Sequence, residues 1–277
     1  MAGLTVTKAA QLSFGPGQTP IDDTEEVSIL TELAALERFE LDRDRLRTVL
    51  ANPYRVMGQR LVAELGEVPE VGAVVVSYAA PDAVVLQLSG PALAELVPGH
   101  PVVLGVGEQG RSTAFSMLDV ACGYARRHGV RSVLAFAFDQ AVLQYRAVSD
   151  VPPLPSGDAA VALLLQMEDD IREDGCAVVW RADLSRATVA GALSSLLDHL
   201  DPRREMPVIA GADLPVDSQS LGDRTLRWHA SGGWPGTELL AEAVTYFNAP
   251  TLAPVLLAEY DPYLREAAVC RLAGSAR

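Results

Sequence analysis

The chain is poor in the residues that build disulfides and metal sites. Its 277 residues include three cysteines and four histidines. Cys122, Cys176 and Cys270 are far apart and form no Cys-x-x-Cys pair, and two of them lie in apolar strand or helix patterns. They therefore predict buried thiols in a reducing cytoplasm. The histidines show no metal-ligand spacing, so we expect no metal site, and we expect no cofactor.

Basic residues and long apolar runs are also scarce. Lysine and arginine number 22 against 36 aspartates and glutamates, which gives a net charge of −14. Because so few cations are available to neutralise phosphates, we expect no unassisted binding to nucleic acid or to an anionic membrane. No run of about 18 apolar residues predicts a transmembrane helix, and the first residues lack the apolar core of a signal peptide. We therefore expect a cytoplasmic protein.

What the chain does have is an alternation of apolar strands and amphipathic helices. Residues 71–78 and 130–138 are typical of buried strands, and residues 112–127 between them have the spacing of an amphipathic helix. Arg126 and Arg127 lie in the last turn of that helix, where the helix dipole favours cations. Such strand–helix–strand alternation predicts a layered α/β domain.

The break at 151–157, VPPLPSG, is followed by two apolar runs separated by an acidic turn. A strand hairpin is the simplest interpretation of these two runs. The pattern then restarts with a further set of helices and strands. Helices are expected at 184–200 and 236–247, and strands at 206–212, 225–229, 254–260 and 266–273. The shared rhythm indicates a duplicated α/β unit, although no exact internal repeat is visible.

Three segments resemble one known family, the β-ketoacyl-ACP synthase III branch of the thiolase-fold enzymes. VGAVVVSYAAPD (71–82) is similar to a family strand that ends in a Thr/Pro/Asp-like turn. VGEQGRSTAF (106–115), with the helix and strand after it, resembles the nucleophile turn. SGDAAVALLL (156–165) resembles a Gly-Asp-Gly-Ala-Gly-Ala stretch. The resemblance implies a layered α/β/α/β/α protein of two duplicated halves, 1–165 and a shortened 166–277.

The family's catalytic residues are all replaced. The resemblance places the nucleophilic cysteine at Ser112, the histidine near Gly211 and the asparagine near Ala230. Decarboxylative Claisen condensation needs a thiolate to carry the acyl chain, and neutral His and Asn donors to hold the enolate oxygen. Each lost donor would cost about 3–4 kcal/mol at the transition state. We therefore expect no condensation by this chain alone.

The C-terminal segment sharpens this expectation. APVLLAEYDPYLREAAVCRLAGSAR is similar to the end of the non-catalytic subunit of the heterodimeric, synthase III-like enzyme of alkylquinolone signal biosynthesis. That subunit also has a short second half, Asp-Pro between its last two strands, and Ser in place of Cys. The matching residues here are Asp261, Pro262 and Ser112.

Several residues have two interpretations. Ser112 is either an acyl-accepting nucleophile, for which His229 would be a weak candidate base, or the cap of the following helix. Glu108, Gln109 and Arg111 either meet a partner subunit, with Arg111 pairing across the interface, or form an exposed loop.

Three functions remain open on this basis. The first is a degenerate subunit of a heterodimer with an active ketosynthase, in polyketide-like or fatty-acid-like secondary metabolism. The second is a Ser-dependent acyltransferase that moves an acyl group between CoA or acyl carrier protein and an acceptor. The third is a homodimeric scaffold or carrier-binding module without chemistry.

Overall fold

A computed structural model gives the fold of the chain. It describes residues 3–21, 24–37, 41–46, 48–84, 88–107, 109–142, 155–168, 175–214, 221–231, 233–249 and 253–275.

The first half forms a five-stranded sheet. Its strands are β1 (Gly3–Phe14), β4 (Ala73–Tyr78), β5 (Val102–Gly107), β6 (Ser132–Asp139) and β7 (Asp158–Glu168), in the order β1-β7-β6-β4-β5. The pairs β4–β5 and β4–β6 are parallel, whereas β7 is antiparallel to both β6 and β1. β4 and β6 lie inside the sheet and are almost wholly buried, which explains their unbroken runs of Val, Ala and Phe.

The second half repeats this topology. Its strands are β8 (Ala177–Arg181), β9 (Val208–Ala210), β10 (Leu226–His229), β11 (Val255–Asp261) and β12 (Glu266–Leu272), in the order β10-β9-β11-β12-β8. Read from the other edge, the order is β8-β12-β11-β9-β10, which corresponds to β1-β7-β6-β4-β5 of the first sheet. Each neighbouring pair has the same relative direction in both sheets, parallel or antiparallel. The duplication expected from the rhythm of the sequence is therefore confirmed at the level of topology.

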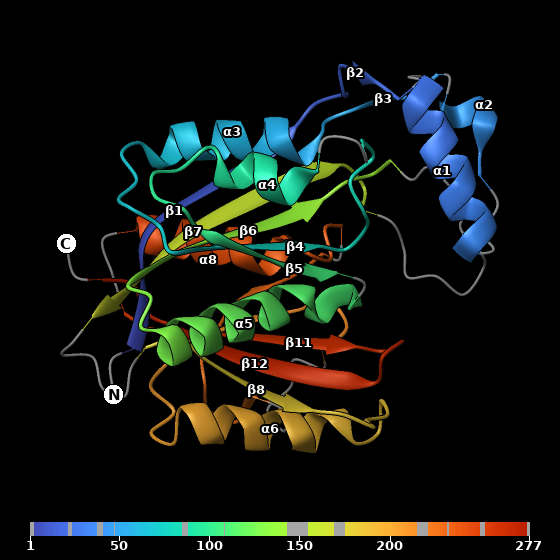
Figure 1. The fold of residues 1–277 in the computed structure, drawn as a ribbon. Coiled ribbons are helices and arrows are strands. Elements are labelled where there is room, and N and C mark those ends of the chain that lie inside the picture. Colours follow the sequence, from blue (N-terminus) through green and yellow to red (C-terminus); the bar gives the residue numbers. More distant parts are fainter. Residues whose placement is uncertain are drawn as a thin grey trace.

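The two sheets and the main helices stack in five layers (Figure 1). α3 (Tyr54–Leu65) and α4 (Ser89–Ala94) cover the outer face of the first sheet, and α6 (Val189–Leu200) covers the outer face of the second. α5 (Thr113–His128) and α8 (Glu238–Asn248) lie between the sheets. α5 buries Phe115, Leu118, Ala121 and Cys122, the helical face that its sequence predicts.

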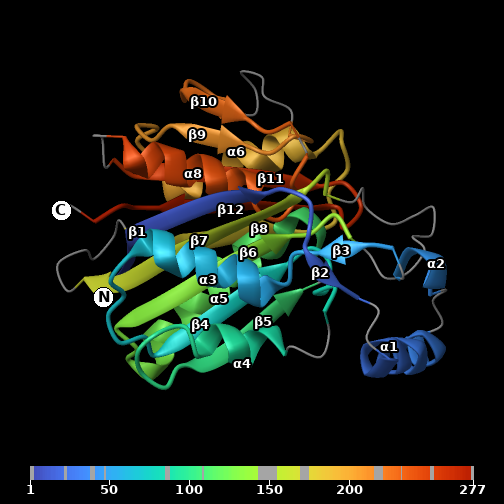
Figure 2. The ribbon, with the colours of Figure 1, turned by 90° about the horizontal axis from the view of Figure 1, so that it is seen from above.

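One small group of elements lies beside the layers (Figure 2). It consists of α1 (Thr24–Glu37), α2 (Arg43–Leu46), and the short paired strands β2 (Thr19–Pro20) and β3 (Leu50–Ala51). Ile21, Leu30 and Leu46 belong to the small apolar cluster that packs these elements together.

The predicted hairpin after residue 157 is wrong. β7 pairs with β1 and β6 in the first sheet, whereas β8 pairs with β12 in the second. The two apolar runs are therefore the last strand of one half and the first strand of the next. β7 also runs on to Glu168, past the expected boundary at residue 165. Within the described ranges, no helix is both long enough and apolar enough to span a bilayer.

Candidate functional site

The nucleophile-like turn lies between β5 and α5. It is the single 3₁₀ turn Gly110–Ser112, and it leads directly into the helix. Gly110 has φ = 51°, and a Cβ at this position would overlap with the carboxylate of Asp261. Glycine is therefore required both by the backbone conformation and by the close approach of Asp261.

Ser112 is completely buried, at 0% exposure. Its hydroxyl makes no capping bond to α5, and Oγ has no hydrogen-bond partner among the described residues. The helix-cap interpretation of Ser112 is therefore wrong. Thr113 Oγ1 serves the turn instead, donating to the Gly110 carbonyl at 2.7 Å. An unpaired buried hydroxyl costs about 1–3 kcal/mol, which makes Ser112 an unusual feature of the core.

The position assigned to the catalytic histidine has no room for a side chain. Gly211 follows β9, and its N–H donates to the Ala258 carbonyl at 2.8 Å. A Cβ on Gly211 would overlap with the carboxyl group of Glu259. Glu259 is only 2% exposed, and burial raises the pKa of its carboxyl to about 8. Near neutral pH, a protonated carboxylic acid therefore fills the space in which the histidine would lie.

Asp261 holds the turn from the end of β11. Its Oδ2 accepts from the Arg111 N–H at 2.9 Å, and its Oδ1 accepts from the Tyr263 and Leu264 N–H groups at 2.8 and 3.0 Å. Gly105, Gly107 and Gly110 have Gly-x-Gly-x-x-Gly spacing between a strand and a helix, a pattern whose N–H groups often hold a phosphate. Here the Asp261 carboxylate of the chain itself accepts from this turn.

Arg111 is paired within its own chain. Its Nε lies 3.2 Å from Asp213 Oδ2, and its side chain is nearly buried. Within the chain the partner of Arg111 is thus Asp213, and contact of this turn with a partner subunit stays a prediction. Gln109 is exposed and accepts a hydrogen bond from Ser116 Oγ, and Glu108 lies outside the described residues.

Ala230, at the position of the asparagine, is buried just after β10. Its N–H donates to the Ala210 carbonyl at 2.8 Å, so its methyl group lies beside the end of β9 and presents no polar atom. His229 is exposed, and its imidazole makes no hydrogen bond or ion pair with the described residues. The structure thus supplies Ser112 with no hydrogen-bonded base among the residues it describes.

The three substituted positions lie at one end of the second sheet. β9, β10 and β11 run parallel, so their carboxyl ends lie at the same edge of the sheet. Gly211 directly follows β9, Ala230 directly follows β10, and Asp261 is the last residue of β11. The Asp261–Arg111 and Arg111–Asp213 bonds then bring the turn of Ser112 to the same place. We call Arg111, Asp213, Glu259 and Asp261 the acidic cluster. Glu259 and Asp213 were not predicted. The only signal for Glu259 was an acid enclosed by the otherwise apolar residues of VLLAEY (255–260).

A second buried carboxyl joins the two halves. Asp139, at the end of β6, accepts from Thr237 through both N–H and Oγ1 at 2.8 Å, and from the Gly236 N–H. It therefore fixes the turn that leads into α8, and burial raises the pKa of its carboxyl to about 6. Among the described residues, no group of three or more His, Cys, Asp or Glu side chains is arranged to hold a metal ion.

Comparison with known proteins identifies the architecture. No family model matches the chain, and no curated protein matches its sequence. Solved structures do match it. The tetronic acid condensing enzyme AbyA1 superposes with a TM-score of 0.64 at 17% identity, over 98% of this chain and 100% of that one. The 3-oxoacyl-(acyl carrier protein) synthase III of Pseudomonas aeruginosa PAO1 gives 0.60 at 13%, over 99% of both chains.

The acyltransferase ChlB3 gives a TM-score of 0.61 at 13% identity, over 99% of this chain and 98% of that one. The fold is the thiolase fold. All three proteins are covered almost from end to end, so the superposition spans both halves of this chain. Identities of 13–17% show the architecture and do not transfer the activities of these proteins.

Proposed function

We propose that this chain is a catalytically degenerate, ketosynthase III-like subunit that forms a heterodimer with an active ketosynthase. The observation that carries the proposal is the acidic cluster. Where the fold would need a histidine, Glu259 fills the space, and Ser112 has neither a thiol nor a hydrogen-bonded base among the described residues. A site packed in this way supports a structural role and not a role in condensation.

The surface best suited to the partner is the β5 edge of the first sheet. β5 is an edge strand of apolar residues, and Val102 is 45% exposed on it. Leu88, 68% exposed, lines a cavity of about 320 Å³ together with Val103 and Gly105 of the same strand. An open, apolar strand edge invites pairing with another chain. Because β5 leads into the Ser112 turn, a partner here would lie beside the acidic cluster.

The test is co-expression with an active ketosynthase III from the same source, followed by size, mass and condensation assays. We expect a stable 1:1 complex, whose activity Ser112→Ala leaves unchanged. Val102→Lys would place a charge on the β5 edge and should weaken the complex by at least about tenfold. Leu50→Lys is the matched control, because Leu50 is similarly exposed, at 49%, on a different sheet. An equal loss of affinity for the ketosynthase with both variants, or no complex at all, would contradict the proposal.

One observation favours a second function, Ser-dependent acyl transfer. Ser112 lies at the start of α5, and its hydroxyl is not engaged by any hydrogen bond with the described residues. Its donor would be acyl-CoA or an acyl carrier protein. Incubation of the lone chain with acyl-CoA would then add an acyl mass that Ser112→Ala abolishes. An unchanged mass would remove this alternative.

A further inference from the structure

The outer edge of β1 is already used for hydrogen bonding at its start, where the Leu4 carbonyl accepts from the Cys176 N–H at 2.8 Å. The Val6 N–H donates to the Ala273 carbonyl at 2.8 Å, and the Ser275 N–H donates to the Val6 carbonyl at 2.9 Å. Val6 and Gly274 thus form a parallel bridge, by which the segment after β12 crosses from the second sheet to the first. This edge therefore accepts an added parallel strand within the molecule itself.

Beyond Val6 the same edge is open. The register shifts between Val6 and Lys8, after which Lys8 pairs with Leu164 and Ala10 with Ala162. Because the peptide groups of a strand alternate in direction, those of Ala9 and Gln11 then face away from β7. No described residue bonds the backbone N–H or C=O of either one. An unpaired edge of this kind is a template for an incoming strand.

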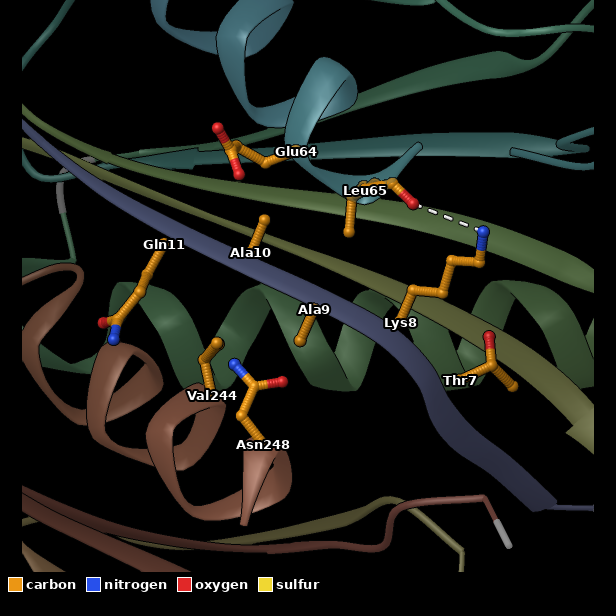
Figure 3. A pocket seen from close by; sticks show the side chains of 9 residues that line it. All are labelled: Thr7, Lys8, Ala9, Ala10, Gln11, Glu64, Leu65, Val244 and Asn248. Atoms are coloured by element: carbon orange, nitrogen blue, oxygen red, sulfur yellow. Dashed lines mark hydrogen bonds between the residues drawn. The ribbon is translucent and has the colours of Figure 1, made fainter. Parts of the chain in front are cut away.

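The open edge lies along the floor of a groove (Figure 3). A cavity of about 730 Å³ has Thr7 to Gln11 of β1 as its floor, the end of α3 on one side and Val244 and Asn248 of α8 on the other. Gln11 also lines a second cavity, of about 350 Å³, that continues the groove along β1 to Ser13. The two cavities together offer the length of an extended peptide segment.

The charges and rings along the groove favour a basic side chain. Glu64 lines the first cavity and Glu242 the second, and neither has an ion-pair partner among the described residues. Trp228 and Trp234 line the second cavity beside Glu242. Indole faces next to a carboxylate attract guanidinium and ammonium groups. Lys8, the one cation among the described residues that line either cavity, is engaged, because its ammonium donates to the Leu65 and Glu67 carbonyls.

We infer that the β1 edge binds an extended segment of a partner polypeptide as an added parallel strand, with an arginine or lysine of that segment held by Trp228, Trp234 and Glu242. The outward N–H and C=O groups of Ala9 and Gln11 would form hydrogen bonds with the added strand. The residues of the second cavity would favour a positively charged side chain. β1 and β5 are opposite edges of the first sheet, so this site is separate from the proposed ketosynthase interface. It stands or fails independently of that proposal.

The probe is a synthetic acetylated peptide amide, TVTVRVTV, titrated into the full-length protein with tryptophan fluorescence and calorimetry as readouts. Two control peptides carry Glu in place of Arg, or N-methyl groups on alternate amides. We expect saturable binding by the first peptide, at least about tenfold weaker binding by each control, and slower hydrogen exchange at Ala9 and Gln11. Absence of saturable binding up to millimolar peptide would overturn the inference.

Protein variants separate pairing at the edge from other modes of binding. Gln11→Pro removes the outward N–H, and Gln11→Ala removes the same side chain but keeps that N–H. Only the proline variant should lose peptide affinity, once both variants are shown to melt like the parent chain. Glu242→Gln should weaken the binding of the Arg peptide and not that of the Glu peptide, because the variant removes an attraction from the first and a repulsion from the second. Equal binding by both Gln11 variants would refute strand pairing, and equal binding of the two peptides would refute the cationic preference.

Discussion

Glu259→Gln should change how the stability of this protein depends on pH. In the folded chain burial raises the pKa of Glu259 to about 8, whereas the ordinary value is 4.5. Between these two values the unfolded chain has released its proton and the folded chain still holds it. The unfolded state then binds fewer protons, so the free energy of unfolding falls as the pH rises. The fall is about 1.4 kcal/mol per pH unit, and at most about 5 kcal/mol in all.

The amide introduced by Glu259→Gln is neutral at every pH, so the variant should lack this loss. Urea unfolding of both proteins, followed at intervals from pH 4.5 to about pH 8, measures the difference directly. We expect the variant to gain stability relative to the parent chain by several kcal/mol across that window, with little further change above it. Glu70→Gln, at an exposed loop position, is the matched control. Its free energy of unfolding should follow that of the parent chain at every pH. Parallel curves for Glu259→Gln would refute the burial of a protonated acid at this position.

Three other substitutions test the packing around the site. Gly211→His should lower the free energy of unfolding by about 1–3 kcal/mol, because its side chain collides with Glu259, and adding Glu259→Ala should recover part of the loss in a double-mutant cycle. Asp139→Ala should lower it by about 2 kcal/mol or more, since the N–H groups at the start of α8 lose their acceptor, and chemical denaturation measures this. Leu118→Ala, in the core between the sheets, should cost about 2–5 kcal/mol and lower the melting temperature, and no change in melting would contradict its burial.

Most of the fold could be predicted from local pattern. The helix from Thr113 to His128 shows its buried face at the apolar positions of its sequence, and the strands from Ala73 and Ser132 are continuous apolar runs, as central parallel strands require. The repeated order of helices and strands predicted the duplication, because each half must bury the same kind of sheet between the same kinds of helix.

Strand pairing could not be predicted in the same way. β7 and β8 are neighbours in sequence and both apolar, which favours a hairpin. The outer partner of β7 is β1, whose pairing joins Phe14 with Asp158 across most of the first half. Neither the sequence of β7 nor that of β8 indicates that β7 pairs with β1. β5 escaped the sequence analysis for another reason, since an edge strand ending in Gly-Val-Gly has little β propensity.

The contacts within the candidate site could not be predicted from the sequence. The positions of Ser112, Gly211 and Ala230 followed from the resemblance, and the structure places all three around one end of the second sheet. The carboxyl of Glu259 comes from a strand adjacent to β9, and only the three-dimensional register shows that it faces Gly211. Spacing along the chain gave no sign of that contact.

This arrangement bears on what building a condensing site at these positions would require. If the site were merely missing its residues, Ser112→Cys together with Gly211→His would rebuild a nucleophile and a donor. Glu259 leaves no space for the histidine, and Asp261 accepts from the N–H of Arg111 in the nucleophile turn. The two acids would therefore have to be replaced first, and Asp261 also accepts from the Tyr263 and Leu264 N–H groups. Replacing Asp261 would leave these N–H groups and that of Arg111 without their acceptor, so installing the cysteine and the histidine would cost stability as well as space.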